Sequence, residues 1–201
     1  DDISGNIGEA QVVSNIECDK TWKIAELWYQ QNFSNDKFSI KMGLYDSNSE
    51  FDVIETGGLF LNSSQGMGHE FAQSGVNGPS ASPTTSLAIR FKLSPSEDFY
   101  FQAAVFDGVS GDPDEPKGTQ IILKSDDGAL IAVEAGYTLP EDHAWGYGKY
   151  AVGGWYYTSK FDDILAKDTT GAPIRRRGNS GFYALPEQTI FQEEDKEQGL
   201  A

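Results

Sequence analysis

The fold is decided by one stretch of the sequence, Lys37-Phe38-Ser39-Ile40-Lys41-Met42-Gly43-Leu44. Its large apolar side chains occupy every second position, and lysine, serine and glycine stand between them. Because side chains alternate between the two faces of a β-strand, one face is apolar and the other polar. The same alternation recurs in residues 86–93. Such strands suit a soluble β-sandwich with the apolar face inside, or a membrane β-barrel with the apolar face in lipid and the polar face lining a channel.

Composition narrows the classes of protein. The chain has 201 residues, with 31 acidic and 15 basic side chains and a formal charge of -16. Such a surface repels phosphates, which argues against a nucleic-acid partner. The single cysteine, Cys18, excludes an internal disulfide. No apolar run is long enough for a transmembrane helix, and a barrel strand needs only about ten alternating residues. No signal peptide is visible, so we expect a processed chain or an internal fragment.

Seven strands are predicted, and the connections between them alternate between long and short. The strands are residues 21–33, 37–45, 84–93, 99–106, 128–137, 147–158 and 178–191, and the long connections are 46–83, 107–127 and 159–177. Outer-membrane barrels have long extracellular loops and short periplasmic turns in this way. The prediction is therefore an all-β, antiparallel transmembrane β-barrel of the porin type. Seven strands cannot close such a barrel, so residues 1–201 are interpreted as one partial barrel domain, incomplete at both ends.

Aromatic side chains gather near the ends of the predicted strands. Examples are Trp22, Phe33, Tyr45, Phe99 and Tyr157. Rings at these positions are typical of the aromatic girdles at the two membrane interfaces. The alternative is that they fill the core of a sandwich.

Several segments together resemble the carbohydrate-selective porin family of Gram-negative outer membranes, the OprB-like porins. They are residues 26–31, 43–52, 59–64, 74–80, 83–87, 102–108, 153–158 and 175–179, for example Gly153-Gly154-Trp155-Tyr156-Tyr157-Thr158. The resemblance implies a sixteen-stranded barrel in the cell outer membrane that lets mono- or oligosaccharides diffuse through. It also implies contact with outer-membrane lipid, and a homotrimer is one possible assembly. The chain resembles the middle portion of such a protein, about half of it.

Two features depart from the family pattern. Pro186 lies inside the last predicted strand, where the family usually has a small residue that can donate its N–H. Proline in a strand predicts a bulge or a sheet edge. Residues 65–70 match only loosely the loop that they resemble, which affects the predicted shape of the constriction.

A sugar pore needs polar groups that replace water on hydroxyls, together with flat apolar faces for sugar rings. The polar phases of the strands supply candidates for the sugar path, with Trp28 as a stacking surface beside Glu26. The candidates on and next to the strands are Glu26, Trp28, Lys41, Arg90, Lys92 and Glu134, with Gln30 and Gln102 in the same phase. The alternative is that most of these are solvated wall charges that balance one another.

The long connection 46–83 has few charges and no strong periodicity, and loops of this length are usually functional or disordered. Its apolar Leu59-Phe60-Leu61 predicts that it packs against something. By resemblance it folds into the barrel and narrows it, with Glu50 and Asp52 near the constriction. The alternative is an outward surface loop.

Arg175-Arg176-Arg177 form the only basic cluster. Three adjacent guanidiniums repel one another unless carboxylates or a ligand pair with them. We expect at least one to line the sugar path. Binding to anionic lipid headgroups and a solvated loop are the alternatives.

No catalytic arrangement is indicated, so the sequence predicts neither an enzyme nor a cofactor. His69 and His143 are isolated, and the acidic turns lack the ligand spacing of a calcium loop. Two other classes stay open: a soluble β-sandwich that binds carbohydrate, and a secreted glycan hydrolase with a β-jelly-roll. The direction of alternation separates the channel from the sandwich, because Lys41 and Arg90 face inward in the channel, whereas Ile40 and Ile89 face inward in the sandwich.

Overall fold

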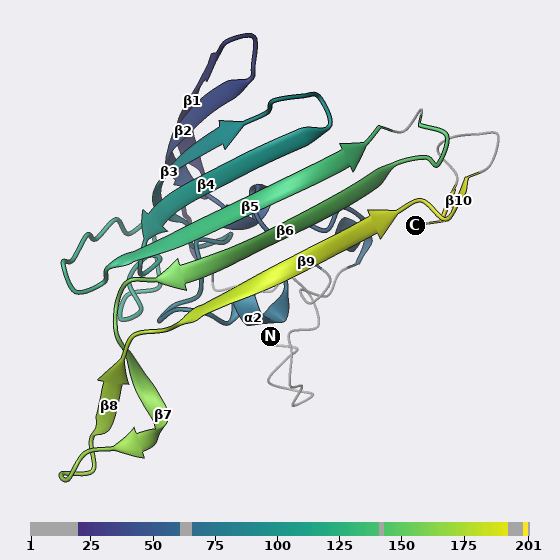
Figure 1. Cartoon of the computed structure of the whole chain (residues 1–201). Coiled ribbons are helices and arrows are strands. Elements are labelled where there is room, and N and C mark those ends of the chain that lie inside the picture. Colours follow the sequence, from purple (N-terminus) through teal and green to yellow (C-terminus); the bar gives the residue numbers. More distant parts are fainter. Residues whose placement is uncertain (1–19, 61–65, 141–142, 193–198, 201) are drawn as a thin grey trace.

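The structure is a computed structural model that describes residues 20–60, 66–140, 143–192 and 199–200. Its main feature is a seven-stranded antiparallel sheet in which consecutive strands are neighbours, in the order β1-β2-β3-β4-β5-β6-β9 (Figure 1). The strands are β1 (Leu27–Phe33), β2 (Phe38–Tyr45), β3 (Ser86–Leu93), β4 (Phe99–Asp107), β5 (Ala129–Leu139), β6 (Gly148–Tyr157) and β9 (Ser180–Gln188). Two small ladders accompany the sheet: β7 (Phe161–Lys167) with β8 (Pro173–Arg176), and β10 (Phe191–Gln192) with β11 (Gly199–Leu200).

The alternation of connections is confirmed. Because the strands are antiparallel neighbours, the connections 46–85, 108–128 and 158–179 all leave the same end of the sheet, here called the long-loop end. The connections 34–37, 94–98 and 140–147 leave the opposite, short-turn end. Within the described residues, β1 and β9 are the two edge strands and the barrel is not closed.

The two faces of the sheet differ as the alternation predicts. The apolar face leaves its large side chains exposed, among them Met42, Phe91, Phe101, Val133, Val152 and Phe182. On the polar face Lys41, Arg90 and Glu134 are buried, because another part of the chain covers them. A sandwich would have buried the apolar face instead, so this arrangement excludes that alternative for this sheet.

The cover on the polar face is the connection after β2. It contains short helices η1 (Ser47–Ser49), η2 (Thr56–Leu59) and α2 (His69–Ala72), and α2 lies beneath the sheet in Figure 1. The ring of Phe71 stacks on Trp155 with centroids 4.8 Å apart. The core therefore lies between the connection and the polar face, and it comprises Tyr45, Phe51, Met67, Phe71, Ala104, Phe106, Leu130, Ala132, Trp155 and Tyr157. None of the helices in the described ranges is long and apolar enough to cross a membrane.

The anchors of this connection differ from the sequence prediction. Leu59 and Phe60 are exposed, and Phe51, Met67 and Phe71 are the residues that pack on the sheet. A run of apolar residues indicates burial only when the backbone presents it to a partner, and here η2 ends at Leu59 with both Leu59 and Phe60 exposed. Leu61, like Cys18, lies outside the described residues.

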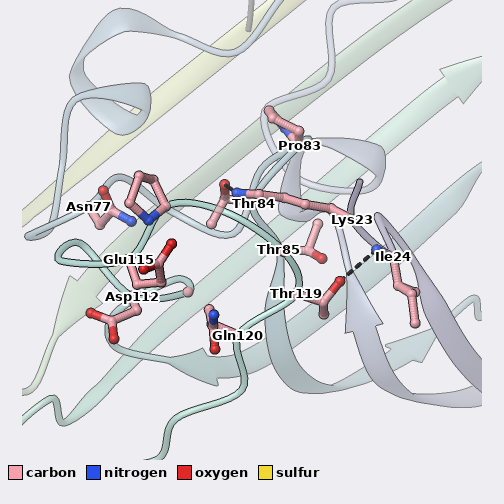
Figure 2. A pocket seen from close by; sticks show the side chains of 13 residues that line it. Lys23, Ile24, Asn77, Pro83, Thr84, Thr85, Asp112, Glu115, Thr119 and Gln120 are labelled. Atoms are coloured by element: carbon pink, nitrogen blue, oxygen red, sulfur yellow. Dashed lines mark hydrogen bonds between the residues drawn. The ribbon is translucent and has the colours of Figure 1, made fainter. Parts of the chain in front are cut away.

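The first strand begins later than predicted, at Leu27 instead of residue 21. The preceding residues bind loops at the long-loop end: Ile24 N–H donates to Thr119 Oγ1 (2.6 Å) and Lys23 Nζ to Thr84 Oγ1 (2.7 Å), beside a pocket of about 90 Å³ (Figure 2). The Ile24 N–H and the Ala25 carbonyl thus have loop threonines as partners, Thr119 and Thr85, in place of a neighbouring strand.

The connection 159–177, predicted as a loop, contains the hairpin β7–β8. Its β7 strand is short and carries a register irregularity between Asp162 and Lys167, which hides the alternation. The hairpin projects beyond the sheet at the long-loop end (Figure 1). The last large strand, β9, pairs with β6 in regular register within the described residues and holds Pro186 opposite Tyr150.

Candidate functional site

The polar face carries rows of facing side chains that the strand register defines. One row pairs Lys41 on β2 with Arg90 on β3. The next row towards the short-turn end contains Ser39, Lys92, Gln102, Glu134, Gly153 and Tyr183. Further on, Lys149 of β6 stands opposite Glu187 of β9. The connection after β2 therefore faces polar groups on six strands of the sheet, β2 to β6 and β9.

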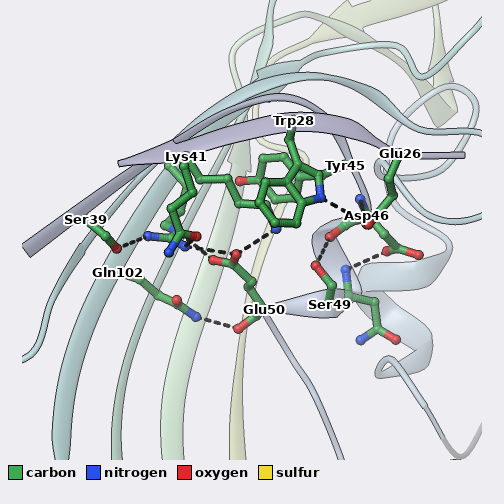
Figure 3. A network of polar contacts seen from close by, with 12 residues as sticks. Glu26, Trp28, Ser39, Lys41, Tyr45, Asp46, Ser49, Glu50 and Gln102 are labelled. Atoms are coloured by element: carbon green, nitrogen blue, oxygen red, sulfur yellow. Dashed lines mark hydrogen bonds and ion pairs between the residues drawn. The ribbon is translucent and has the colours of Figure 1, made fainter. Parts of the chain in front are cut away.

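Glu50 is held by two cations of the first row (Figure 3). Its carboxylate accepts from Lys41 Nζ at 3.0 Å and from Arg90 Nε and Nη2 at 2.5 and 3.0 Å. Burial raises the pKa of Glu50, but the hydrogen bonds and charges of Arg90 and Lys41 outweigh it, so that its pKa lies below the usual 4.5. Arg90 also donates to Ser39 Oγ and Gln30 Oε1. Lys41 and Arg90 therefore both have partners within the protein.

From Glu50 the chain crosses the whole polar face, and residues 50–56 are called the crossing segment here. Each strand on its way contributes at least one polar side chain. Gln102 of β4 donates to the Glu50 carbonyl, and Lys149 of β6 donates to the Val53 carbonyl at 2.8 Å. Glu187 of β9 accepts from the backbone N–H groups of Glu55 and Thr56 at 3.1 and 3.0 Å. Together with Lys41 of β2 and Arg90 of β3, which hold the Glu50 side chain, five strands thus fasten this segment.

The strand between these, β5, contributes Glu134. Its carboxylate accepts from the Asp52 N–H at 3.0 Å, from the hydroxyls of Tyr100 and Tyr183 at 2.7 Å each, and from Gln102 Nε2 at 3.1 Å. The side chain is buried, and within the described residues it forms no ion pair. Neutral donors therefore stabilise this carboxylate, as buried charges require.

Asp52 is the most constrained residue of the crossing segment. It is 1% exposed and adopts a left-handed backbone with φ 54°. Its Oδ2 accepts from the Gly68 N–H at 2.7 Å, which ties the crossing segment to the residues before α2. Burial raises the pKa of Asp52, and the nearby Glu134 and Glu70 raise it further, against the lowering effect of the Gly68 hydrogen bond.

Trp28 and Glu26 lie beside this network (Figure 3). The Trp28 ring is 45% exposed and has Lys41 Nζ 4.4 Å from its centroid, and its Nε1 donates to Glu26 at 3.2 Å. Glu26 precedes β1 and accepts from the Asp46 N–H. Lys92 is half-buried, with Nζ 4.8 Å from the centroid of Tyr100. The structure thus brings together Glu26, Trp28, Lys41, Glu50, Asp52, Arg90, Lys92 and Glu134.

The arginine cluster lies elsewhere. Arg175 and Arg176 are on β8, about 60% exposed, and they face Asp162 and Asp163 of β7 at 3.7 and 3.0 Å. Arg177 follows β8 and is exposed. The three arginines therefore belong to the projecting hairpin and not to the network on the polar face.

The sequence analysis did not select Tyr100, Lys149, Tyr183 and Glu187. All four stand in the polar phase of their strands, which is a signal that could have found them. The prediction of an aromatic girdle at the strand ends includes Tyr100, and Glu187 follows the unusual Pro186. Among the described residues, no three histidine, cysteine or acidic side chains converge as a metal site.

Comparison with known proteins gives the family. A family model described as carbohydrate-selective porin, OprB family, matches residues 2–201. Porin B of Pseudomonas aeruginosa is 23% identical over 183 residues, which cover 85% of this chain and 38% of that protein. The high-pH structure of Pseudomonas putida OprB superimposes with a TM-score of 0.68 at 18% identity, covering 92% of this chain and 44% of that one. The chain spans less than half the length of these relatives. With nearly its whole length matched, the chain belongs to the OprB family of carbohydrate-selective porins.

Proposed function

We propose that this chain forms part of the wall and the constriction of an outer-membrane channel through which sugars diffuse passively. The observation that carries the proposal is the crossing segment, fastened across the polar face by six strands while the opposite face exposes apolar side chains. A sheet with these faces fits a barrel with lipid outside and water inside. A rigid inward segment then sets the width and polarity of the opening.

The solutes that fit are mono- or oligosaccharides. The half-exposed Trp28 ring offers a flat apolar face, and the exposed carboxylate of Glu26 beside it can accept hydrogen bonds from hydroxyls. Passive diffusion needs no nucleophile or cofactor, so the protein acts as a channel and not as an enzyme. Lys41 and Arg90 are buried and contribute to the channel indirectly, because they position Glu50.

The hairpin β7–β8 leaves the long-loop end, which faces the outside of the cell in this proposal. Arg175, Arg176 and Arg177 would then meet solutes before the crossing segment does. Contact of the apolar face with outer-membrane lipid belongs to the same proposal, and a homotrimer stays a prediction.

The full-length protein, extracted with detergent and reconstituted in planar bilayers, tests the function. We expect stepwise ion currents that glucose or maltose reduces in a concentration-dependent way. A polyethylene glycol of similar size is the control, and it should reduce the current less. A protein that dissolves without detergent and gives no current would refute the proposal. Release of products from a glycan by the same preparation would favour the hydrolase alternative.

A further inference from the structure

A polar hollow of about 290 Å³ lies between the crossing segment and the short-turn end of the sheet. The residues that matter for its chemistry are Glu55, Lys92, Glu97, Tyr100, Tyr147 and Lys149. The volume is near the lower end of the range for small-molecule sites, roughly 300–1,000 Å³. The hollow therefore has room for one small solute and not for a chain of sugars.

Lys92 differs from the other cations of the polar face. Lys41 and Arg90 are paired with Glu50, and Lys149 donates to the Val53 carbonyl, with Glu55 at 3.8 Å. Lys92 forms no ion pair in the described part of the chain. Its ammonium group lies over the Tyr100 ring, so its N–H donors remain available to a solute.

The two tyrosines have different roles. The Tyr100 hydroxyl is bound to Glu134, and its ring lies against Gly136, where a Cβ would overlap it. Tyr100 is therefore held in place and forms one wall of the hollow. The Tyr147 hydroxyl makes no hydrogen bond within the described ranges, and burial together with Glu55 and Glu187 raises its pKa to about 12. It stays protonated at neutral pH and can donate to a solute.

The charges around the hollow balance. Glu50 also lines the hollow, but its charge is compensated by Lys41 and Arg90. The remaining charges are Lys92 and Lys149 against Glu55 and Glu97, so neither a sugar acid nor an amino sugar gains from the net charge. Neighbouring donors and acceptors instead suit a neutral polyhydroxylated ring, because each hydroxyl can both donate and accept.

From this arrangement we infer that the hollow is a second sugar subsite, which holds one neutral monosaccharide between Lys92 and Tyr147 on the short-turn side of the crossing segment. The inference rests on the proposed function and adds a place and a solute class to it. Solutes that pass the crossing segment would pause there before they leave the channel.

The test uses block of the ion current by glucose in the full-length protein. Lys92→Met and Tyr147→Phe should each weaken the block about 2- to 10-fold, the range for one hydrogen bond exchanged with water. Lys124→Gln, an exposed lysine in the connection 108–128, is the matched control and should leave the block unchanged. Glucuronate should block the wild type no better than glucose.

The outcomes separate the two proposals. If glucose does not block the wild-type current, the proposed function fails. If glucose blocks the wild type and both variants equally, the channel stands and the subsite is refuted. Tyr147→Phe removes only one hydroxyl, which makes no hydrogen bond within the described ranges, so this variant should fold as the wild type does. It therefore tests the subsite even if Lys92→Met does not assemble.

Discussion

Glu50 neutralises the two buried cations of neighbouring strands, and this makes it the residue on which the crossing segment depends. Its side chain is 14% exposed, against 7% for Lys41 and 4% for Arg90. Charges this deep cannot be left unpaired cheaply, because removing one partner of a buried pair costs about 3–5 kcal/mol. The ion triad therefore fixes the start of the segment more firmly than any surface pair could.

Replacing this carboxylate tests its role. Glu50→Gln should release the start of the crossing segment, raise single-channel conductance and weaken sugar block. The lowered pKa adds a pH signature: stability from Glu50 is present above 4.5 and is lost as the pH falls through its lower folded value. Wild-type conductance should therefore rise in acid, and that of Glu50→Gln should not. Glu115→Gln, on an exposed loop, is the control; equal behaviour of the two variants would contradict the assignment.

Asp52 should show the opposite dependence on pH. Its pKa is raised above 3.8, so the folded protein holds this proton more tightly than the unfolded chain, and stability is lost as the pH rises through the folded pKa. Asp52→Asn keeps an oxygen for the Gly68 N–H and cannot ionise. In urea unfolding, Asp52→Asn should gain stability relative to the wild type as the pH rises from 3.8 through the folded pKa of Asp52. A constant difference across this range would show that Asp52 does not titrate there.

Much of this residue-level network could be predicted from the sequence, and its connectivity could not. The alternation placed Lys41, Arg90 and Glu134 on one face because a strand has a fixed period. The period does not say which loop group reaches each side chain. That depends on the path of residues 50–56, which turn at the positive φ of Asp52 and have no repeating pattern.

At the scale of elements, the connection after β2 is held by packing as well as by polar contacts. Phe71 of α2 is 1% exposed and stacks on Trp155, whereas Phe60 is 58% exposed. Phe71→Ala should cost about 3–5 kcal/mol of local packing and increase conductance, because the cover loosens. Phe60→Ala, the same substitution on the same connection, should change little. The reverse ranking would restore residues 59–61 as the anchor that the sequence indicated.

The hairpin β7–β8 gives the arginine cluster a separate role to test. Its pairs with Asp162 and Asp163 are exposed, and such pairs contribute about 0–1 kcal/mol. Changing Arg175, Arg176 and Arg177 together to Gln should therefore leave folding intact. We expect the channel to pass cations more readily and sugar block to weaken, measured as reversal potential and block. If both are unchanged, the cluster lies off the sugar path.

The elements themselves were largely predictable where the alternation is long. Strands β2 to β6 match their predicted ranges within about two residues, which is the usual uncertainty of strand and helix ends. The failures have local causes. Residues 21–26 look like strand but bind loop side chains, and β7 is too short and irregular for its alternation to be read.

At the scale of the whole molecule, the two faces of the sheet suit two different surroundings, water on the polar face and lipid on the apolar face. The covered polar face and the exposed apolar face are the two sides of one sheet. A shift of one residue along a strand would therefore move each side chain from one face to the other. Lys41 and Arg90 stand side by side, and the neighbouring row of β2 and β3 pairs Met42 with Ile89. A channel wall requires such separation on every strand, and a soluble sheet exposed on its apolar side would aggregate.

A substitution at Ile89 tests whether lipid or water covers the apolar face. It stands in the middle of β3, paired with Met42 and Val105 on the two adjacent strands. Ile89→Arg should cost about 2–4 kcal/mol if this position faces the middle of a bilayer, measured by urea unfolding of the full-length protein in lipid vesicles. Ile121→Arg, on an exposed stretch of the connection 108–128, is the matched control and should be tolerated. An equal effect of the two substitutions would mean that water, and not lipid, covers this face.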